Sequence, residues 1–105
     1  MTTNHSVYTI VYMIFEWDIN KETENVAKHA VDFETACRVF QDERRIVMDD
    51  VKHSDIEPRY SIIGLVDEKI LTVRFTMRGT TVRIIGAGYW RKEKKHYEQK
   101  YNLGR

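Results

Sequence analysis

The sequence predicts a small α+β domain in which an antiparallel sheet combines with two N-terminal helices and a C-terminal helix. Three stretches, at about 59–66, 69–77 and 80–87, follow one another with short turns between them, and residues 69–77 alternate strictly between apolar and polar side chains. Three further stretches, at about 19–29, 33–40 and 89–101, carry helix signals. A chain of 105 residues has room for one hydrophobic core only.

The N-terminal half is predicted to hold a short strand at 13–17 followed by the two helices. Asp18 and Asp32 precede the helices, and each carboxylate can accept hydrogen bonds from first-turn N–H groups. The second helix has one apolar stripe, formed by Phe33, Ala36, Cys37 and Phe40. Cys37 lies in that stripe, so we interpret it as a core residue rather than a nucleophile.

A strand at 44–49 leads into an acidic loop at 49–58. The spacing of the acidic residues and of His53 in this loop matches no calcium-binding loop, so we predict a surface loop rather than a metal site. Pro58 favours an extended backbone at Glu57. Glu57 is therefore expected to reach the residues at the start of the next strand.

Two predicted turns fix the pairing of the last three strands. A turn at Asp67-Glu68 pairs Arg74 with Ser61, and a turn at Arg78-Gly79 pairs Arg74 with Arg83. One face of the sheet is then apolar and suited to contact with the first two helices: Tyr60, Ile62, Val73, Phe75, Val82 and Ile84. The opposite face gathers Arg59, Arg74, Arg83, Ser61, Thr76 and Thr81.

Arginines on one face of a sheet need an explanation, because directly opposed like charges are destabilising. One interpretation is a surface kept ready for an anion, since the planar guanidinium binds two phosphate oxygens at once. The alternative is a salt-bridged sheet face in which Glu57 or Glu93 neutralises the arginines. Both interpretations remain open at this point.

The last helix is predicted to pack through its aromatic residues and to expose a basic surface. Trp90, Tyr97 and Tyr101 share a helical face, while lysines and Arg91 occupy the rest. Charge is uneven along the chain: residues 1–57 carry a net −6 and residues 58–105 a net +7. A basic C-terminal half favours a polyanionic partner such as nucleic acid.

Several classes of protein are excluded or disfavoured by composition. A single cysteine rules out an internal disulfide, and without an export signal we expect a cytoplasmic location. The longest uncharged apolar stretch, residues 7–15, is too short to cross a membrane. No zinc or nucleotide-binding motif is present, so we expect no cofactor and no metal.

An ordered series of short motifs resembles the BrnT family of type II toxins. The resemblance runs over about residues 13–101 and is most specific in F-E-W-D at 15–18 with Lys28-His29 ending eleven residues after Asp18. Further matching positions are Lys21, Asn25, Asp32-Phe33-Glu34, Ala36, Val39-Phe40, Asp42, His53-Ser54, Glu57-x-Arg59, Gly64, Phe75-Thr76, Arg78, Arg83-Ile84-Ile85, Glu93 and Tyr97.

The resemblance implies a RelE-like fold, with the helices packed on one face of a twisted antiparallel sheet. It implies a ribonuclease toxin that halts translation. It also implies neutralisation by a BrnA-like antitoxin that has a ribbon-helix-helix DNA-binding part. The complex would repress its own operon, so that operator DNA is contacted only through the antitoxin.

The sequence departs from the family pattern in two places. The family usually reads R-I-I-S-A-R before the last helix, whereas this chain has Gly86 and Gly88 at the fourth and sixth positions. The missing arginine leaves two alternatives, a ribonuclease of lowered activity or a non-catalytic module that binds RNA or an antitoxin. Residues 1–12 precede the family pattern, so we expect an N-terminal extension, with Met13 as an alternative start, ahead of a single domain at 13–105.

We expect metal-free RNA cleavage, in which the RNA's own 2′-hydroxyl attacks the adjacent phosphate. Arg59, Arg74 and Arg83 are the candidates for stabilising the charged phosphorane, and Glu57 is the candidate base. His53 is the alternative for a proton-transfer role. The candidate RNA-binding residues are Lys28, His29, Arg78, Arg91, Lys92 and Lys95. Lys28 and His29 also fit a simpler role, complementing the helix dipole.

Overall fold

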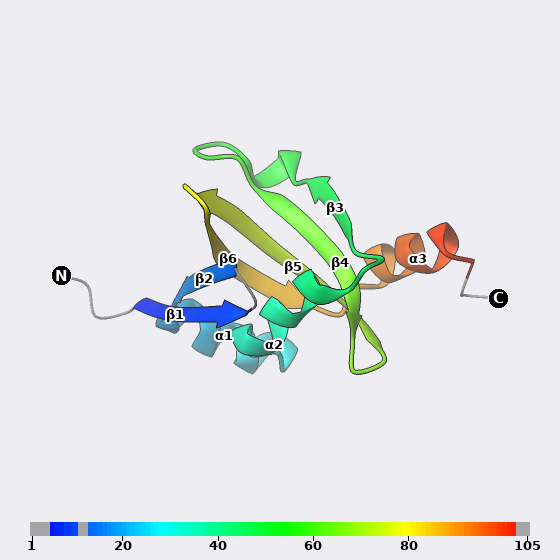
Figure 1. Cartoon of the computed structure of the whole chain (residues 1–105), viewed down its shortest axis with the longest axis horizontal. Coiled ribbons are helices and arrows are strands. Elements are labelled where there is room, and N and C mark those ends of the chain that lie inside the picture. The colour runs from blue at the N-terminus through cyan, green and yellow to red at the C-terminus, as the bar shows by residue number, and fades with distance from the viewer. Residues whose placement is uncertain (1–4, 11–12, 103–105) are drawn as a thin grey trace.

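The computed structural model describes residues 5–10 and 13–102, and it confirms an α+β architecture. The elements in chain order are β1 His5–Ile10, β2 Met13–Asp18, α1 Ile19–His29, α2 Phe33–Cys37, the 3-10 helix η1 Arg38–Gln41, β3 Ile46–Asp49, the 3-10 helix η2 Val51–His53, β4 Tyr60–Val66, β5 Lys69–Arg78, β6 Thr81–Gly88 and α3 Arg91–Lys100. Six strands form one sheet in the order β1-β2-β6-β5-β4-β3, and α3 lies at the opposite end of the molecule from β1 (Figure 1).

The prediction of a purely antiparallel sheet is wrong at one position, because β2 runs parallel to β6. The two strands are joined through α1, α2 and the strands between them, and a long connection of this kind permits parallel pairing. The sequence analysis names no secondary structure before residue 13. Residues 5–10 form the edge strand β1, antiparallel to β2.

Both predicted helix caps are confirmed. The Asp18 carboxylate accepts a hydrogen bond from the N–H of Asn20 at 2.8 Å, and Asp32 accepts one from the N–H of Thr35 at 2.7 Å. The second helix is shorter than predicted, since α2 ends at Cys37 and tightens into η1. This 3-10 turn lies directly on β4, where a Cβ at Gly64 would stand only 2.9 Å from Val39 Cγ1.

The F-E-W-D segment ties β2 to both helices. Phe15 is fully buried, and the indole N–H of Trp17 donates to Glu22 Oε1 at 3.0 Å. The second oxygen of Glu22 accepts the N–H of Phe33 at 2.9 Å, at the start of α2. One carboxylate of α1 therefore links the strand before it to the helix after it.

The predicted apolar face of the sheet is buried in the main core, where Tyr60 is the one partly buried member. Its residues join Phe33, Ala36, Cys37 and Val39 in a single cluster. Burial, followed by the nearby charge of Glu34, raises the pKa of the Cys37 thiol to about 12. The thiol therefore stays protonated at neutral pH, which agrees with a core role.

The other face of the sheet is partly covered by α3. Tyr97 packs with Ile46 and Ile63 in a second, smaller cluster, and Tyr101 lies against it. The third predicted aromatic of this helical face, Trp90, does not join them. Trp90 lies before the first turn of α3 and contacts His29 and Arg74 instead.

The β4–β5 register is confirmed, and the β5–β6 register is corrected. Arg74 pairs with Ser61 as predicted, and positive φ values of 50° at Asp67 and 70° at Glu68 form the two-residue turn. The β5–β6 turn is centred on Gly79 and Thr80, because Arg78 pairs with Thr81. Gly79 adopts φ 62° there.

Arg74 and Arg83 are consequently not directly opposed. Arg83 pairs with Thr76, and a bulge between Arg74 and Phe75 brings Arg74 opposite Gly86. The observed pairing of β5 with β6 differs from the predicted pairing by two residues. A shift of two residues leaves each side chain on the same side of the sheet. The arginines therefore lie on the predicted face, but no two of them are directly paired, so the predicted repulsion does not arise.

Asn25 extends the hydrogen bonding of β6 beyond the end of β2. β2 pairs with β6 only as far as Arg83, and the Asn25 side chain bonds the β6 backbone beyond that point. Its Oδ1 accepts the Ala87 N–H at 3.1 Å, and its Nδ2 donates to the Ala87 carbonyl at 2.9 Å. The same amide nitrogen donates to the Val31 carbonyl at 3.0 Å. One buried side chain thus fixes α1 to the end of β6.

The Asp42 carboxylate connects three parts of the chain. It accepts hydrogen bonds from the Tyr97 hydroxyl at 2.6 Å, the Leu65 N–H at 2.7 Å and the Arg44 N–H at 3.0 Å. Burial alone would raise the pKa of Asp42, but these three donors together hold it below its usual value. Burial, together with the hydrogen bond to Asp42, raises the pKa of the Tyr97 hydroxyl.

We expect Asp42 to make unfolding pH-dependent under acidic conditions. Because its pKa is lower in the folded state, its stabilisation is complete above the unfolded pKa of about 4 and is lost as pH falls through the folded pKa. Asp42→Asn removes this titration. In urea unfolding between pH 6 and pH 2, the variant should lose less stability on acidification than the parent chain.

The exposed loop residue Asp55 provides the matched control. Asp55→Asn should leave the acid dependence of unfolding unchanged. An Asp42→Asn variant with the same pH dependence as the parent would contradict this account.

None of the helices in the described part of the chain is long and apolar enough to cross a membrane.

Candidate functional site

Four guanidinium-bearing residues share the sheet surface opposite the main core, and we call this set the arginine face: Arg59, Arg74, Arg78 and Arg83. Arg74 and Arg78 alternate along β5 with the buried Phe75, and Arg83 lies across from Thr76 on β6. Arg59 immediately precedes Tyr60, which packs on the core side. The predicted gathering of Arg59, Arg74 and Arg83 on one side of the sheet is therefore observed.

Two carboxylates accompany the arginine face. Glu57 lies between two of the arginines, with 3.9 Å from its Oε2 to Arg59 Nη2 and 3.4 Å from its Oε1 to Arg78 Nη2. Glu16 on β2 bonds Arg83, with 3.1 Å between Glu16 Oε2 and Arg83 Nη1. The salt-bridged interpretation thus holds in part, through Glu57 as named and through Glu16 in place of Glu93.

The segment before β4 holds the backbone of Arg59 in place. The N–H of Arg59 donates to Ser54 Oγ at 2.9 Å, and the Arg59 carbonyl accepts the N–H of Asp50 at 2.8 Å. A depression of about 400 Å³ opens beside Glu57, Arg59 and Tyr60. Arg59 Nε is buried and lacks a hydrogen-bond partner among the described residues, so its ion pair does not use all its donors.

His53 is not brought to the arginines. Its Nδ1 lies 3.0 Å from the Asp50 carboxylate, and the ring is about half exposed. The predicted base or acid is therefore on the same loop as Glu57 but is engaged with a neighbouring carboxylate. Of the two residues predicted to transfer protons, Glu57 is the one whose side chain contacts the arginines.

Arg74 is held in a different way from the other arginines. Its Cζ lies 4.6 Å from the centroid of the Trp90 ring, in a cation–π contact. His29, at the end of α1, meets the same indole edge-on at 5.3 Å. Of the two predicted RNA-binding residues on α1, His29 thus lies near the arginine face, whereas Lys28 is exposed to solvent.

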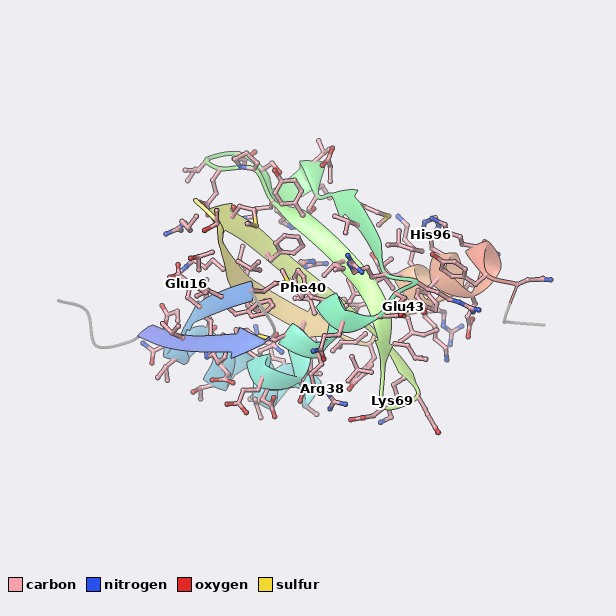
Figure 2. All side chains as sticks on the ribbon, in the orientation of Figure 1. Glu16, Arg38, Phe40, Glu43, Lys69 and His96 are labelled. Carbon is pink, nitrogen blue, oxygen red and sulfur yellow. The ribbon has the colours of Figure 1, made fainter. Side chains whose placement is uncertain are left out.

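The predicted basic residues of α3 lie on its exposed surface. Arg91, Lys92 and Lys95 are all solvent-exposed, and His96 marks the same helix in Figure 2. The helix packs on the end of β4 and β5 through Tyr97. Its cations therefore flank the arginine face rather than belong to it.

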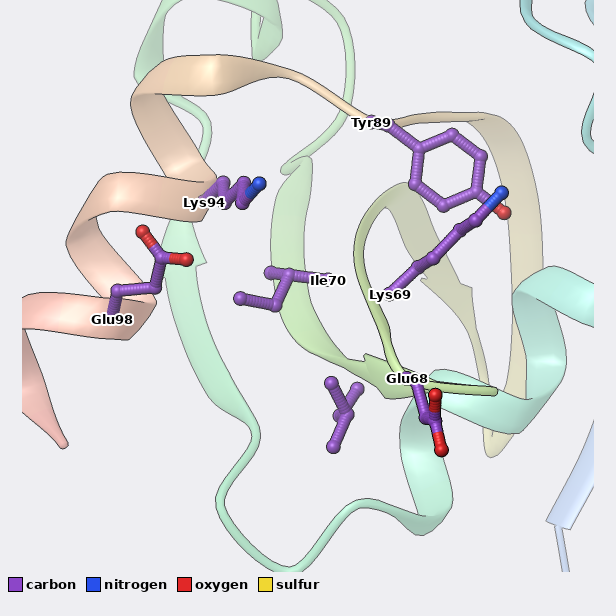
Figure 3. Close-up of a pocket in the computed structure, with 7 residues that line it drawn as sticks. Glu68, Lys69, Ile70, Tyr89, Lys94 and Glu98 are labelled. Carbon is purple, nitrogen blue, oxygen red and sulfur yellow. The ribbon is translucent and has the colours of Figure 1, made fainter. Parts of the chain in front are cut away.

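A second hollow of about 510 Å³ lies between α3 and the β4–β5 turn (Figure 3). Leu65, Ile70 and Tyr89 line it together with charged side chains of both signs. None of the predicted site residues is among its lining residues. The described residues contain no group of three or more histidine, cysteine or acidic side chains placed to hold a metal.

The arrangement suits an anionic polymer. Four guanidiniums outnumber the two carboxylates that contact them, so the open face keeps an excess of positive charge. Arginine binds phosphate through two parallel N–H donors, and the neighbouring Thr81 adds a hydroxyl group, whereas Ser61 is buried. A carboxylate at the edge of such a face is positioned for proton transfer.

A family model for the ribonuclease toxin BrnT of type II toxin-antitoxin systems matches residues 17–94. The chain belongs to the BrnT family. No curated protein matches the chain. BrnT membership supplies the chemical class, a ribonuclease toxin, for which the family implies an RNA substrate and an antitoxin partner.

Sequence reasoning missed two residues that contact the arginine face, Glu16 and Trp90. Glu16 alternates along β2 with the buried Phe15 and Trp17. This alternation indicates that Glu16 faces away from the core, but it does not indicate that Glu16 pairs with Arg83 on β6. The sequence pattern places Trp90 on the packing face of the last helix. Gly88, two residues before Trp90, is the available signal, because a residue without a Cβ at the end of a strand often permits close packing.

Proposed function

We propose that this BrnT protein inhibits translation by metal-independent endonucleolytic cleavage of RNA on the arginine face. The observation that carries the proposal is the meeting of four arginines and Glu57 on one open sheet surface. We further propose a RelE-like fold with α1 and α2 on the opposite side of the sheet. We also propose the cytoplasm as the place of action.

In the proposed reaction the 2′-oxygen of a ribose attacks the adjacent phosphorus. Glu57 accepts the 2′-hydroxyl proton, and Arg59, Arg74 and Arg83 stabilise the charge of the phosphorane. The bond from phosphorus to the 5′-oxygen then breaks, and the 5′-oxygen takes up a proton. The products are a 2′,3′-cyclic phosphate and a free 5′-hydroxyl. His53 stays the alternative residue for one of the two proton transfers.

The cations that flank the arginine face are proposed to bind the RNA backbone. Arg78 and Arg91, Lys92 and Lys95 of α3 would contact the RNA backbone on either side of the cleaved bond. His29 would contribute from the end of α1, with Lys28 beside it. Contacts of this kind lower affinity steeply as salt increases, whatever the RNA sequence.

The proposed partner is a BrnA-like antitoxin with a ribbon-helix-helix DNA-binding part. The toxin would reach operator DNA only through this antitoxin, and the complex would repress its own operon. We keep residues 1–12 as a proposed extension ahead of the toxin domain.

The test is cleavage of end-labelled single-stranded RNA, free and ribosome-bound, in buffer containing EDTA. We expect fragments that end in a 2′,3′-cyclic phosphate, and no cleavage where the 2′-hydroxyl is replaced by hydrogen. Cleavage of the 2′-deoxy position, or cleavage only after Mg²⁺ is added, would overturn the mechanism.

A second candidate is a non-catalytic module that binds RNA or an antitoxin. Gly88, in place of the family arginine, favours this alternative. Gly88→Arg would not simply restore the arginine of the family, because a Cβ at this position would stand 2.7 Å from Trp90 Cζ2 and displace the indole. RNA binding without any cleavage in the assay above would support the alternative.

A further inference from the structure

Trp90 rests directly on the backbone at the end of β6. A Cβ built at the buried Gly88 would lie 2.7, 2.8 and 3.0 Å from three carbon atoms of the indole. Real Cβ contacts are almost never this short, and the obstructing group is a bulky ring rather than a flexible chain end. The indole therefore occupies its position only because residue 88 has no side chain.

Trp90 is also held in place by a contact with α1. The ring of His29 meets it edge-on, with centroids 5.3 Å apart and an angle of 74° between the planes. Such edge-to-face pairs are a favoured aromatic geometry. The end of one helix and the end of one strand together fix the indole beside the arginine face.

Arg74 differs electrostatically from the other three arginines. Arg59 and Arg78 share Glu57, and Arg83 is paired with Glu16. No carboxylate among the described residues forms an ion pair with Arg74, whose guanidinium lies over Trp90. An indole face attracts the cation without neutralising it and without using its in-plane N–H donors.

We propose that Trp90, seated on Gly88, is a positioning residue that holds the Arg74 guanidinium with its N–H donors free for an RNA phosphate. Gly88 is then a requirement of this arrangement, because any side chain there displaces the indole. The inference rests on the proposed function, since it assigns Arg74 to phosphate recognition.

The experiment compares Trp90→Ala, Gly88→Ala, Arg74→Ala and the double variant Gly88→Ala/Trp90→Ala. The probe is a fluorescein-labelled, non-cleavable 2′-O-methyl RNA oligonucleotide, and binding is measured by anisotropy. We expect Trp90→Ala and Gly88→Ala each to weaken binding about 3- to 30-fold, the range of a cation–π contact. The double variant should bind no more weakly than Trp90→Ala, because both changes remove the same contact.

Trp90→Phe keeps an aromatic face and should recover part of the affinity. Tyr89→Ala is the matched control, since Tyr89 is the neighbouring exposed aromatic and contacts Lys69 instead of an arginine of this face. Its binding should equal that of the parent chain. The NMR signal of the Arg74 Nε–H should shift in Trp90→Ala and Gly88→Ala, with the Arg83 signal unmoved.

Parent-like binding by Trp90→Ala, together with weakened binding by Arg74→Ala, would overturn the positioning role and leave the proposed function intact. Additive losses in the double variant would overturn it as well. Parent-like binding by Arg74→Ala would instead remove phosphate recognition by Arg74 and count against the proposed function itself.

Discussion

Replacing Arg83 with alanine is expected to lower the rate of RNA cleavage about 100- to 1,000-fold. This is the usual cost of removing one preorganised group that stabilises charge in a transition state. Arg83 lies on β6, an interior strand of the sheet, and Glu16 holds its guanidinium, with 3.1 Å between Arg83 Nη1 and Glu16 Oε2. A cation held in this way needs little reorganisation when charge develops on the phosphorane. Single-turnover cleavage of a labelled RNA measures the effect.

Arg38→Ala is the matched control for Arg83→Ala. It removes the same charge from η1, where Arg38 bonds both oxygens of Asp67 at 2.9 and 2.7 Å. Figure 2 shows Arg38 well apart from Glu16, the partner of Arg83. Arg38→Ala should cleave RNA within about threefold of the parent rate. Equal losses in both variants would mean that general charge, rather than the arginine face, sets the rate.

Replacing Asn25 with alanine is expected to lower the free energy of unfolding by about 2–4 kcal/mol. The change leaves the Ala87 N–H and the carbonyls of Ala87 and Val31 without their partner, and each buried unsatisfied group costs about 1–3 kcal/mol. Urea unfolding measures the effect.

Two further variants define the cause of that loss. Asn25→Asp should be no milder than alanine, because a second carboxylate oxygen would face the Ala87 and Val31 carbonyls in place of the amide donor. Asn20→Ala, an exposed change on the same helix, should alter stability by about 0.5 kcal/mol at most. An Asn25→Ala variant as stable as the parent would contradict the role of Asn25 in capping β6.

Local signals in the sequence predicted the local structure well. The caps at Asp18 and Asp32 depend on residues two or three positions away, and both are confirmed. The turn at Asp67-Glu68 fixed the β4–β5 register correctly because the strands on both sides have clear ends. At Arg78-Gly79-Thr80 the glycine can take either central position of a two-residue turn. The sequence analysis places it at the second position and the structure at the first, so the β5–β6 register differs from the prediction by two residues.

Long-range contacts explain most of what the sequence did not predict. The pairing of Glu16 with Arg83 requires the parallel contact of β2 with β6, which no local pattern specifies. The contact of Trp90 with Gly88, Arg74 and His29 joins β5, β6 and α1 at one point. By contrast, the gathering of arginines on one face could be predicted from the alternation of side chains along three strands. A two-residue change in register does not alter which face each side chain lies on.

Whether RNA binds to the arginine face is tested by an NMR titration of the protein with a non-cleavable 2′-O-methyl RNA oligonucleotide, monitored at the arginine Nε–H signals. We expect the largest shifts at Arg59, Arg74 and Arg83, with little change at Arg38 on the helical side. Shifts confined to the cations of α3, or spread equally over every arginine of the chain, would contradict the assignment of RNA binding to the arginine face.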